Sequence, residues 1–261
     1  MESSLWVSKT GLDAQQKRMT VISNNLANVN TVGFKRDRAV FEDLLYQNIR
    51  QPGGSTGGDN VAPTGLMMGT GVRIVSTEKL HTQGSTIQTD NALDFAIQGE
   101  GMFQVLQPDG SFGYTRDGSF KLSVDRELVT ANGMPVQPSI VIPQNAESIS
   151  VGEDGTVSVQ PYGNAQEQVL GQIQVARFVN YAGLKPIGQN LYAETNASGQ
   201  PNLTAPDTNG AGRISQGALE AANVNVVEEM VNMIETQRAY EINSKAISSV
   251  DSMLRFLNQN L

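Results

Sequence analysis

The sequence lacks cysteine entirely and has a single histidine, His81. The absence of cysteine excludes disulfides and thiolate metal sites. One histidine cannot form a histidine metal cluster within the chain, and it leaves a Ser/His/Asp triad only one candidate base. We therefore expect no metal and no cofactor, and we expect His81 to lie in a loop or at the surface.

Long apolar runs and an excess of positive charge are also missing. No window holds about 18 uninterrupted apolar residues, so we expect no transmembrane helix and no membrane insertion. The net charge of −8 argues against nucleic acid or an anionic membrane surface as partner. The opening residues have neither the basic nor the apolar region of a secretory signal peptide, so we expect a cytoplasmic protein or one exported without a cleaved leader.

Both ends of the chain repeat apolar residues every seven positions, as helices do when they pack against a partner helix. The first repeat defines an N-terminal seam of Leu5, Leu12, Met19, Ile22 and Leu26. The second repeat is unbroken and defines a C-terminal seam of Val226, Met233, Tyr240, Ile247, Leu254 and Leu261. These patterns predict a helix at each end of the chain.

The C-terminal helix has a clear start signal, because Asn225 followed by Glu228 fits a capping box. A helix from about residue 226 to the end would be roughly 54 Å long. Its seam is too long to be buried against a compact domain of this size. Residues 1–38 carry six Lys or Arg and three acids, a net of +3, whereas residues 214–261 carry three and six, a net of −3. The two chain ends are therefore plausible partners.

The middle of the chain is rich in turns. Gln51–Gly71 contains seven glycines and two prolines and is typical of a flexible loop or linker. Short alternating segments follow, separated by turns such as Pro108-Asp109-Gly110, Asp117-Gly118, Asn132-Gly133 and Asp154-Gly155. We predict an α+β fold with paired, coiled-coil-like terminal helices and a central β-rich domain of antiparallel hairpins. The expected divisions are a helix over 1–35, an extension and Gly-rich loop over 36–70, the β-rich domain over 71–213 and a helix over 214–261.

Catalytic signals are weak. Gly99-Glu100-Gly101 resembles a nucleotide-binding fingerprint but lacks its third glycine. Asp90, Asp94 and Glu100 would suit a paired-carboxylate hydrolase, yet acidic residues beside turns usually have a structural role. We expect no catalytic residue and no enzyme.

Three segments resemble the bacterial flagellar axial proteins, the rod, hook and hook-associated family. "NNLANVNTVGFKR" (24–36) matches the N-terminal signature of that family and "NVNVVEEMVNMIETQRAYEINSKAI" (223–247) matches its C-terminal signature. The segment 97–137 is similar to the family's β-rich region, and 39–53 with the Gly-rich stretch after it resembles the distal-rod branch. Two positions depart from the family pattern: Met102 replaces a common aromatic, and Arg126-Glu127 replaces an Asn-Gly turn.

The resemblance implies a structural subunit that polymerises through its terminal helices into a tubular drive shaft, the distal rod of the basal body. It implies as partners further copies of the chain, proximal rod proteins, hook protein, peptidoglycan-associated and outer-membrane ring proteins, and the flagellar export apparatus. The implied location is the basal body from the periplasm to the outer membrane. The alternatives are a peptidoglycan hydrolase and a glycan-binding secreted protein, and an aromatic content of 6% argues mildly against the latter.

Three further assignments concern assembly. We expect the two seams, which cannot be buried within one chain, to be buried between subunits. Asparagine is a mediocre helix former, so the cluster of Asn24, Asn25 and Asn28 calls for a reason, and we expect it to fix the register between subunits rather than only to cap the helix. We expect the Gly-rich loop to set the spacing between inner and outer layers. Its defining residues are Pro52, Gly53, Gly54 and Pro63.

Overall fold

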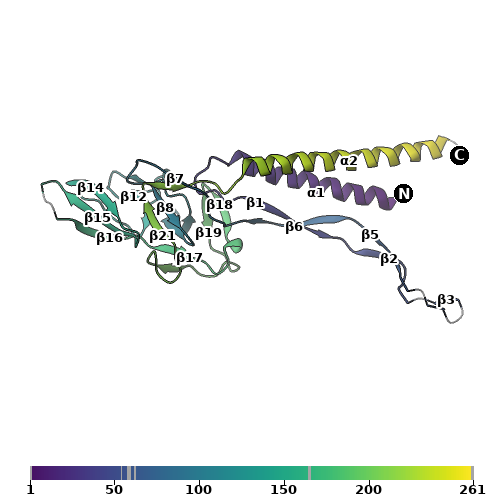
Figure 1. Ribbon diagram of the computed structural model, residues 1–261, viewed down its shortest axis with the longest axis horizontal. Helices are drawn as coiled ribbons and strands as arrows, with labels where there is room; N and C mark the ends of the chain where they lie inside the picture. Colours follow the sequence, from purple (N-terminus) through teal and green to yellow (C-terminus); the bar gives the residue numbers. More distant parts are fainter. Residues whose placement is uncertain (1, 54, 58–59, 62, 164–165, 260–261) are drawn as a thin grey trace. The chain divides into compact units, whose positions relative to one another are not determined.

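The computed structural model describes residues 2–53, 55–57, 60–61, 63–163 and 166–259. The chain forms two compact units (Figure 1). Unit 1 comprises the described parts of 1–27, 37–78 and 225–261, and unit 2 comprises 28–36 and the described parts of 79–224. The helices lie in unit 1 and most of the strands lie in unit 2.

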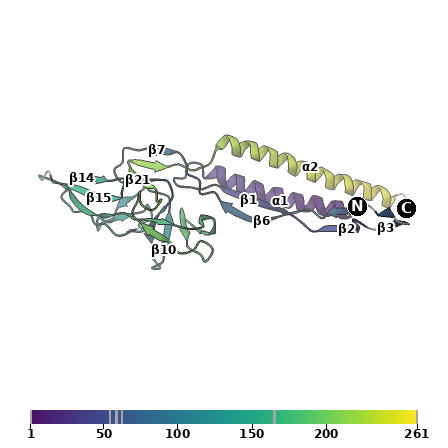
Figure 2. The ribbon, with the colours of Figure 1, turned by 60° about the horizontal axis from the view of Figure 1, so that its bottom comes forward.

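Unit 1 contains the two long helices, α1 (Glu2–Ala27) and α2 (Val226–Gln259). They lie side by side and run antiparallel, so that the start of α1 and the end of α2 are at the same end of the pair (Figures 1 and 2). The contacts follow this direction: a Cβ on Gly11 would lie 3.2 Å from the Asn243 side chain, and Arg18 donates to Asn232 at 3.5 Å. The predicted pair of terminal helices and the α+β class are confirmed.

The predicted start of α2 is confirmed. The Asn225 side-chain oxygen accepts hydrogen bonds from the backbone N–H groups of Val227 (3.1 Å) and Glu228 (3.4 Å), as an N-cap residue does. The first helix is shorter than predicted, because α1 ends at Ala27 and not near residue 35. Thr31 and Phe34 donate instead to carbonyls three residues earlier, which converts the segment after α1 into successive turns.

The expectation of a flexible loop in Gln51–Gly71 is wrong where the structure describes it. Strand β1 (Asp37–Asp43) pairs with β6 (Val72–Lys79), β2 (Tyr46–Arg50) pairs with β5 (Leu66–Gly69), and β3 (Ser55–Gly57) pairs with β4 (Asn60–Val61). These three pairs form a ribbon in unit 1. Apolar and β-branched residues such as Val40, Tyr46 and Ile49 favour strands, and cross-strand hydrogen bonds outweigh the entropy of the glycines.

Unit 2 is built from antiparallel strands, as predicted. Its largest sheet has the order β18-β19-β10-β9-β17-β20, with β13 also paired to β9. Those strands are β9 (Met102–Leu106), β10 (Phe112–Thr115), β13 (Val136–Gln137), β17 (Val175–Arg177), β18 (Lys185–Gly188), β19 (Leu191–Ala193) and β20 (Asn202–Thr204). The smaller sheets use β7 (Thr86–Gln88), β8 (Phe95–Gln98), β11 (Lys121–Leu122), β12 (Leu128–Val129), β14 (Ala146–Val151), β15 (Thr156–Pro161), β16 (Gln168–Gln172), β21 (Arg213–Gln216) and β22 (Ala218–Glu220). A short 3₁₀ helix, η1, spans Tyr181–Gly183.

Strands from the two ends of unit 2 pair with each other. Strand β8 pairs antiparallel with β21, and β7 pairs antiparallel with β22. The first strands of unit 2 therefore have partners only once its last strands are in place. Most of the described core is one apolar cluster in which the rings of Phe103 and Phe120 meet edge to face at 5.1 Å. Met102, at the position where the family often has an aromatic, is buried in a second, smaller cluster.

The turn predictions were partly right. Asp109-Gly110 joins the antiparallel strands β9 and β10, and Asp154-Gly155 joins β14 and β15. Asp117-Gly118 does not join two paired strands; a Cβ on Gly118 would lie 1.7 Å from the Phe95 carbonyl oxygen, so glycine is required by a close backbone approach. Arg126, which replaces part of an Asn-Gly turn, has a φ of 60° and so keeps the left-handed conformation that Asn or Gly would favour.

Candidate functional site

Most of the predicted seam residues lie on the partly buried faces of α1 and α2. In the N-terminal seam Ile22 is buried, and half-buried positions are Leu5, Leu12, Met19 and Leu26. In the C-terminal seam Val226 is exposed, Leu261 lies outside the described residues, and the half-buried positions are Met233, Tyr240, Ile247 and Leu254. The half-buried side of α2 includes Asn232 and Asn243, which meet α1. The half-buried seam residues of α2 thus lie on the same side of the helix as the side chains that meet α1.

A second apolar stripe on α2 was missed by the sequence analysis. Val227, Met230, Val231 and Ile234 follow the i, i+3, i+4, i+7 spacing of one helix face. Each of these side chains is at least 50% exposed. We call these four residues the outward stripe. The i, i+3, i+4, i+7 spacing is present in the sequence, next to the unbroken heptad repeat.

The asparagines bond within their own chain. Asn25 is buried, donates to the backbone oxygen of Asp37 at 2.9 Å and accepts from the Asp37 N–H at 2.8 Å. Asn24 donates to the Asp37 carboxylate at 3.3 Å. The Asn28 side-chain oxygen accepts from the Thr31 hydroxyl at 3.2 Å. Asn25 therefore fixes the last turn of α1 to the first residue of β1, both in unit 1.

The residues chosen for the layer-spacing loop lie in the ribbon. Pro52 and Gly53 form a turn in which Gly53 has a φ of 80°, and Pro63 is at a bend. All three are exposed. Gly54 lies outside the described residues.

Unit 2 contains a buried charge cluster, which we define as Lys35, Arg116 and Glu220. The Lys35 ammonium group is 2.6 Å from one carboxylate oxygen of Glu220, and the Arg116 guanidinium bonds the other oxygen. Arg116 also donates to the carbonyls of Ile97 (2.8 Å) and Gly99 (2.7 Å). All three side chains are at most 5% exposed. The cluster joins residues 185 positions apart in the sequence.

Contacts in this structure account for each residue of the "GFK" (33–35) in the N-terminal motif. Gly33 has a φ of 69°, and a Cβ there would lie 2.7 Å from the Arg116 carbonyl carbon. The Phe34 ring lies 4.8 Å from the Lys79 ammonium, a cation–π contact. Lys35 then enters the buried cluster. This role of Lys35 was not predicted from the sequence, although Lys35 and Glu220 both belong to the end segments 1–38 and 214–261.

Burial shifts the pKa values of the ionisable groups in and beside this cluster. Burial lowers the pKa of Lys35, although the adjacent Glu220 opposes this shift. Burial also acts to raise the pKa of Glu220, yet the charges of Arg116 and Lys35 outweigh it, so that pKa lies below its ordinary value. Burial, with the positive charges of Lys35, Lys79 and Arg116, lowers the pKa of His81 to about 4. His81 lies in a loop, as expected, but it is partly buried rather than at the surface.

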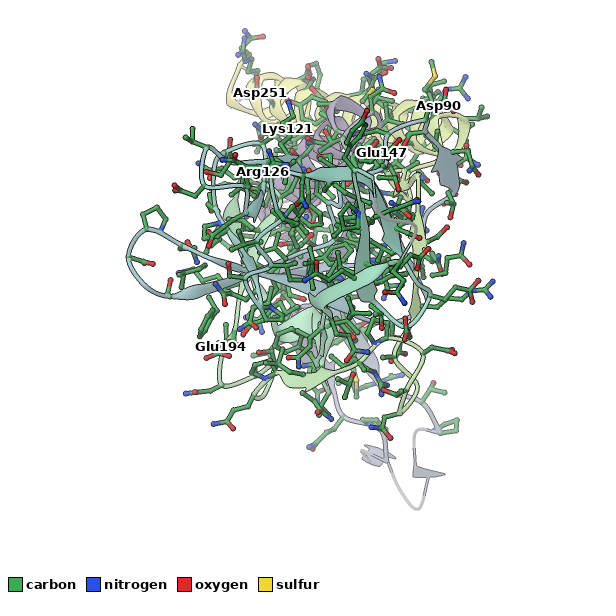
Figure 3. All side chains as sticks on the ribbon, turned by 90° about the vertical axis from the view of Figure 1, so that its left-hand side faces the viewer. Asp90, Lys121, Arg126, Glu147, Glu194 and Asp251 are labelled. Atoms are coloured by element: carbon green, nitrogen blue, oxygen red, sulfur yellow. The ribbon has the colours of Figure 1, made fainter. Side chains whose placement is uncertain are left out.

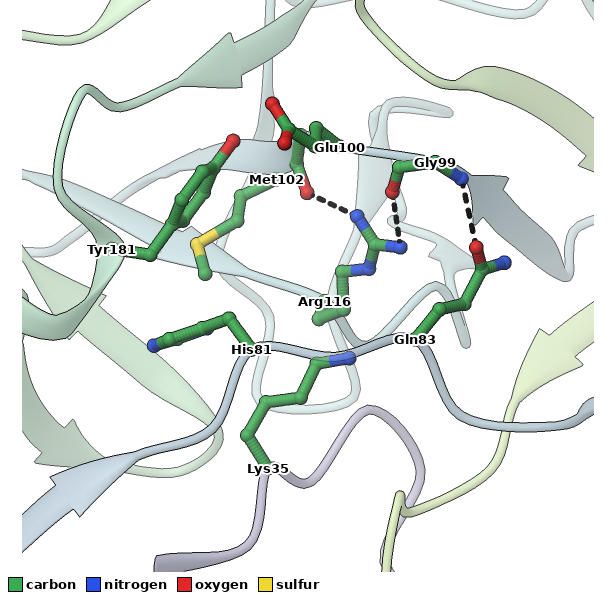
Figure 4. A pocket seen from close by; sticks show the side chains of 9 residues that line it. Lys35, His81, Gln83, Gly99, Glu100, Met102, Arg116 and Tyr181 are labelled. Carbon is green, nitrogen blue, oxygen red and sulfur yellow. Dashed lines mark hydrogen bonds between the residues drawn. The ribbon is translucent and has the colours of Figure 1, made fainter.

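A cavity of about 240 Å³ lies beside this cluster in unit 2 (Figure 4). Figure 4 shows the rings of His81 and Tyr181 on one side of it and the Arg116 guanidinium on the other. The remaining lining residues are Lys35, Gln83, Gly99, Glu100, Gly101 and Met102.

Two of the three candidate carboxylates, Asp94 and Glu100, are held in hydrogen bonds or an ion pair with neighbouring side chains. Asp94 accepts from the Thr89 hydroxyl at 2.8 Å and from the Asn91 amide at 2.9 Å. Glu100 pairs with Arg177 at 2.8 Å, and Asp90 is exposed (Figure 3). Among the described residues, no group of three or more His, Asp or Glu side chains is placed to hold a metal ion. In the part of the chain that the structure describes, no helix is both long and apolar enough to cross a membrane.

Comparisons with known families define the class of protein. Residues 5–35 match the family "Flagella basal body rod protein", residues 96–159 match "Flagellar hook protein FlgE/F/G D1 domain", and residues 215–260 match "Flagellar basal body rod FlgEFG protein C-terminal". The three matches include α1, much of unit 2 and α2. The chain is therefore a flagellar axial protein of the rod and hook class, and the resemblance of its terminal motifs is confirmed.

Relatives that match along their full length show which family within this class the chain is most similar to among those compared. The chain is 56% identical to the flagellar basal-body rod protein FlgG of Buchnera aphidicola from Acyrthosiphon pisum, over 99% of this chain and 100% of the relative. It is 56% identical to FlgG of Buchnera aphidicola from Schizaphis graminum, with the same shares covered. It is 46% identical to FlgG of Borreliella burgdorferi, over 99% of this chain and 98% of the relative.

The chain belongs to the FlgG family of flagellar basal-body rod proteins. It is a structural subunit of the rod and not an enzyme. These relatives give no support to the alternatives of a peptidoglycan hydrolase or a glycan-binding secreted protein.

Proposed function

We propose that the chain forms the distal rod by polymerising through its terminal helices into a tubular drive shaft that links the proximal rod to the hook. The observation that supports this most directly is the outward stripe on α2. Apolar surface gains roughly 25 cal/mol for each Å² removed from water. A single chain leaves Val227, Met230, Val231 and Ile234 exposed, and a neighbouring copy in a polymer would cover them.

The heptad seams and the outward stripe have separate roles in this proposal. The seams hold α1 and α2 together as a coiled-coil-like pair, and the outward stripe joins that pair to a second copy. Head-to-tail contacts that do not close produce a helical filament. In this proposal α1 and α2 form the inner helical domain of the rod. The segments 28–35 and 214–224, which the sequence had assigned to that domain, belong to the β-rich unit 2.

The partners of such a subunit are the proximal rod proteins and the hook protein at its two ends. We place it in the basal body between periplasm and outer membrane, inside the peptidoglycan-associated and outer-membrane rings. It reaches that position through the flagellar export apparatus.

Asn24 and Asn28 fix the register between copies in this proposal, and the ribbon with Pro52, Gly53 and Pro63 sets the spacing between layers. Both asparagines have bonds within the chain, so the double variant Asn24→Ala/Asn28→Ala tests which bonds matter. Normal secretion with shortened rods supports a register role. Rods of normal length at normal secretion would mean that the two asparagines act only through their bonds within the chain. Deleting Pro52–Pro63 should change rod stiffness, and rods of normal stiffness would contradict the spacing role.

Electron microscopy of the purified protein at high concentration tests polymerisation. We expect tubes or short filaments from the unaltered chain. Ile234→Asp places a charge in the outward stripe and should abolish them, whereas Gln237→Asp places the same charge on an exposed polar position of the same helix and should not. Filaments of normal length from Ile234→Asp would refute the role of the stripe.

A further inference from the structure

The connection between β20 and β21 contains a tight turn with a left-handed backbone. The Ala211 N–H donates to the Thr208 carbonyl at 2.8 Å, so Asn209 and Gly210 are the two central residues of a β-turn. Their φ angles are 50° and 78°, with the signs that a type I′ turn requires. Both residues are exposed, and the Gly210 N–H has no hydrogen-bond acceptor among the described residues. Solvent therefore reaches the peptide group that joins them.

A peptide step from asparagine to glycine has a reaction of its own. The glycine nitrogen, after losing its proton to base, attacks the side-chain carbonyl carbon of the asparagine. A C–N bond forms, the side-chain nitrogen leaves as ammonia, and a five-membered succinimide ring remains. Water then opens the ring to aspartate or to isoaspartate, in which the main chain runs through the β-carbon. Glycine favours the attack because it has no side chain to obstruct it, and asparagine is a thermolabile residue for this reason.

The chain has two such steps, and the structure holds them differently. In the other step the Gly133 N–H donates to the Thr130 carbonyl at 2.9 Å, and the Asn132 amide donates to the Gln189 side chain at 3.4 Å. Both hydrogen bonds have to break before the nitrogen can lose its proton and meet the side-chain carbon. The step at 209–210 has neither bond among the described residues. The fold therefore restrains one step and leaves the other free to react.

The guanidinium group of Arg177 lies against the peptide group between Asn209 and Gly210. Its Nη1 donates to the Asn209 carbonyl oxygen, and a Cβ on Gly210 would lie 3.3 Å from the same Nη1. Its Nη2 pairs with Glu100 at 2.8 Å, which helps to hold the guanidinium in place. When the Gly210 nitrogen loses its proton, amide resonance moves negative charge onto that carbonyl oxygen. A charged donor at this oxygen stabilises the ionised peptide group, as an oxyanion hole does.

We propose that Asn209 is a site of spontaneous deamidation, with the Gly210 nitrogen as nucleophile and Arg177 stabilising its ionised form, and that the fold protects Asn132. The product adds a negative charge beside Arg177, where it competes with Glu100 for the guanidinium. The isoaspartate product also lengthens the turn by one main-chain carbon between β20, which pairs with β17, and β21, which pairs with β8. The reaction belongs to the single chain, so it does not depend on polymerisation.

Peptide mapping by mass spectrometry follows both steps in one sample, because each conversion of amide to carboxylate changes the mass of its peptide. Full-length protein is incubated at pH 8, once folded and once in concentrated urea. In the folded protein we expect Asn209 to deamidate roughly tenfold faster than Asn132, since two hydrogen bonds restrain the Asn132 step. In urea the turns are lost, and the two steps should react at similar rates. Folded protein in which Asn132 reacts as fast as Asn209 overturns the proposal.

Arg177→Gln tests the role of the guanidinium, because it removes the charge beside the reacting peptide group. It should slow the reaction at Asn209 several-fold and leave Asn132 unchanged. Arg213→Gln is the matched control, because it removes an arginine that is 51% exposed and pairs with Glu153 at 3.4 Å. The rate at Asn132 in each sample corrects for any general loosening of the fold. A rate at Asn209, relative to Asn132, that is the same in Arg177→Gln and in the unaltered chain would contradict the role of Arg177.

Discussion

Replacing Glu220 by glutamine should destabilise unit 2 more than any other single charge removal in the described part of the chain. The side chains of Lys35 and Glu220 are 2% and 1% exposed, so Glu220→Gln leaves Lys35 and Arg116 buried without a counter-charge. Removing one partner of a buried ion pair typically costs about 3–5 kcal/mol. A loss of this size is a large fraction of the roughly 5–15 kcal/mol by which whole domains are stable.

The assay is urea unfolding of the full chain followed by near-ultraviolet circular dichroism, to which the buried Tyr114 and Tyr192 contribute. Lys35→Met should cost less than Glu220→Gln, because the Glu220–Arg116 pair remains. Glu100→Gln is the matched control: its side chain is 61% exposed in the ion pair with Arg177, and exposed pairs contribute about 0–1 kcal/mol. A cost for Glu220→Gln no larger than that of Glu100→Gln would refute the reasoning.

Three further outcomes follow from the structure. Asn25→Ala should lower stability by about 1–3 kcal/mol, because it removes the buried amide that bonds both the N–H and the carbonyl of Asp37. Asn24→Ala, at an exposed position, should cost less, and thermal melting of the α-helical signal compares the two variants. Gly33→Ala should cost about 1–3 kcal/mol in urea unfolding, since Gly33 has a φ of 69° and no room for a Cβ. His81 should make stability fall as the pH drops from 6.5 towards 4, because the unfolded chain then binds a proton that the folded chain does not, by up to about 3 kcal/mol; His81→Gln should remove that part of the pH dependence, and an unchanged dependence would contradict the lowered pKa.

Local signals carried the parts of the fold that could be predicted. The cap at Asn225 placed the start of α2, and the turns at Asp109-Gly110 and Asp154-Gly155 placed two hairpins. In each of these cases the residues that determine the structure are neighbours in the sequence. The same holds for the heptad repeats that predicted the helix pair.

The parts that could not be predicted depend on distant residues or on competing patterns. Nothing local shows that Lys35 meets Glu220, because 185 positions separate them and the pairing requires the whole of unit 2. The glycine content of Gln51–Gly71 indicated a loop, yet the pairing of Gln47 with Met68 across the ribbon makes strands there. The outward stripe lies on α2 beside the heptad repeat, and only the structure separates the two faces.

The accessibility of the outward stripe before and after assembly tests the central claim most directly. The chain has no cysteine, so Ile234→Cys introduces a unique thiol at a side chain that is 50% exposed. The rate of maleimide labelling is measured in dissociated and in assembled protein, with Val124→Cys, at a position 98% exposed in unit 2, labelled in parallel to report general access to the polymer. The account predicts fast labelling of both thiols in the dissociated protein and strong protection of the Ile234→Cys thiol after assembly. Equally fast labelling of that thiol in polymer and subunit would contradict the account.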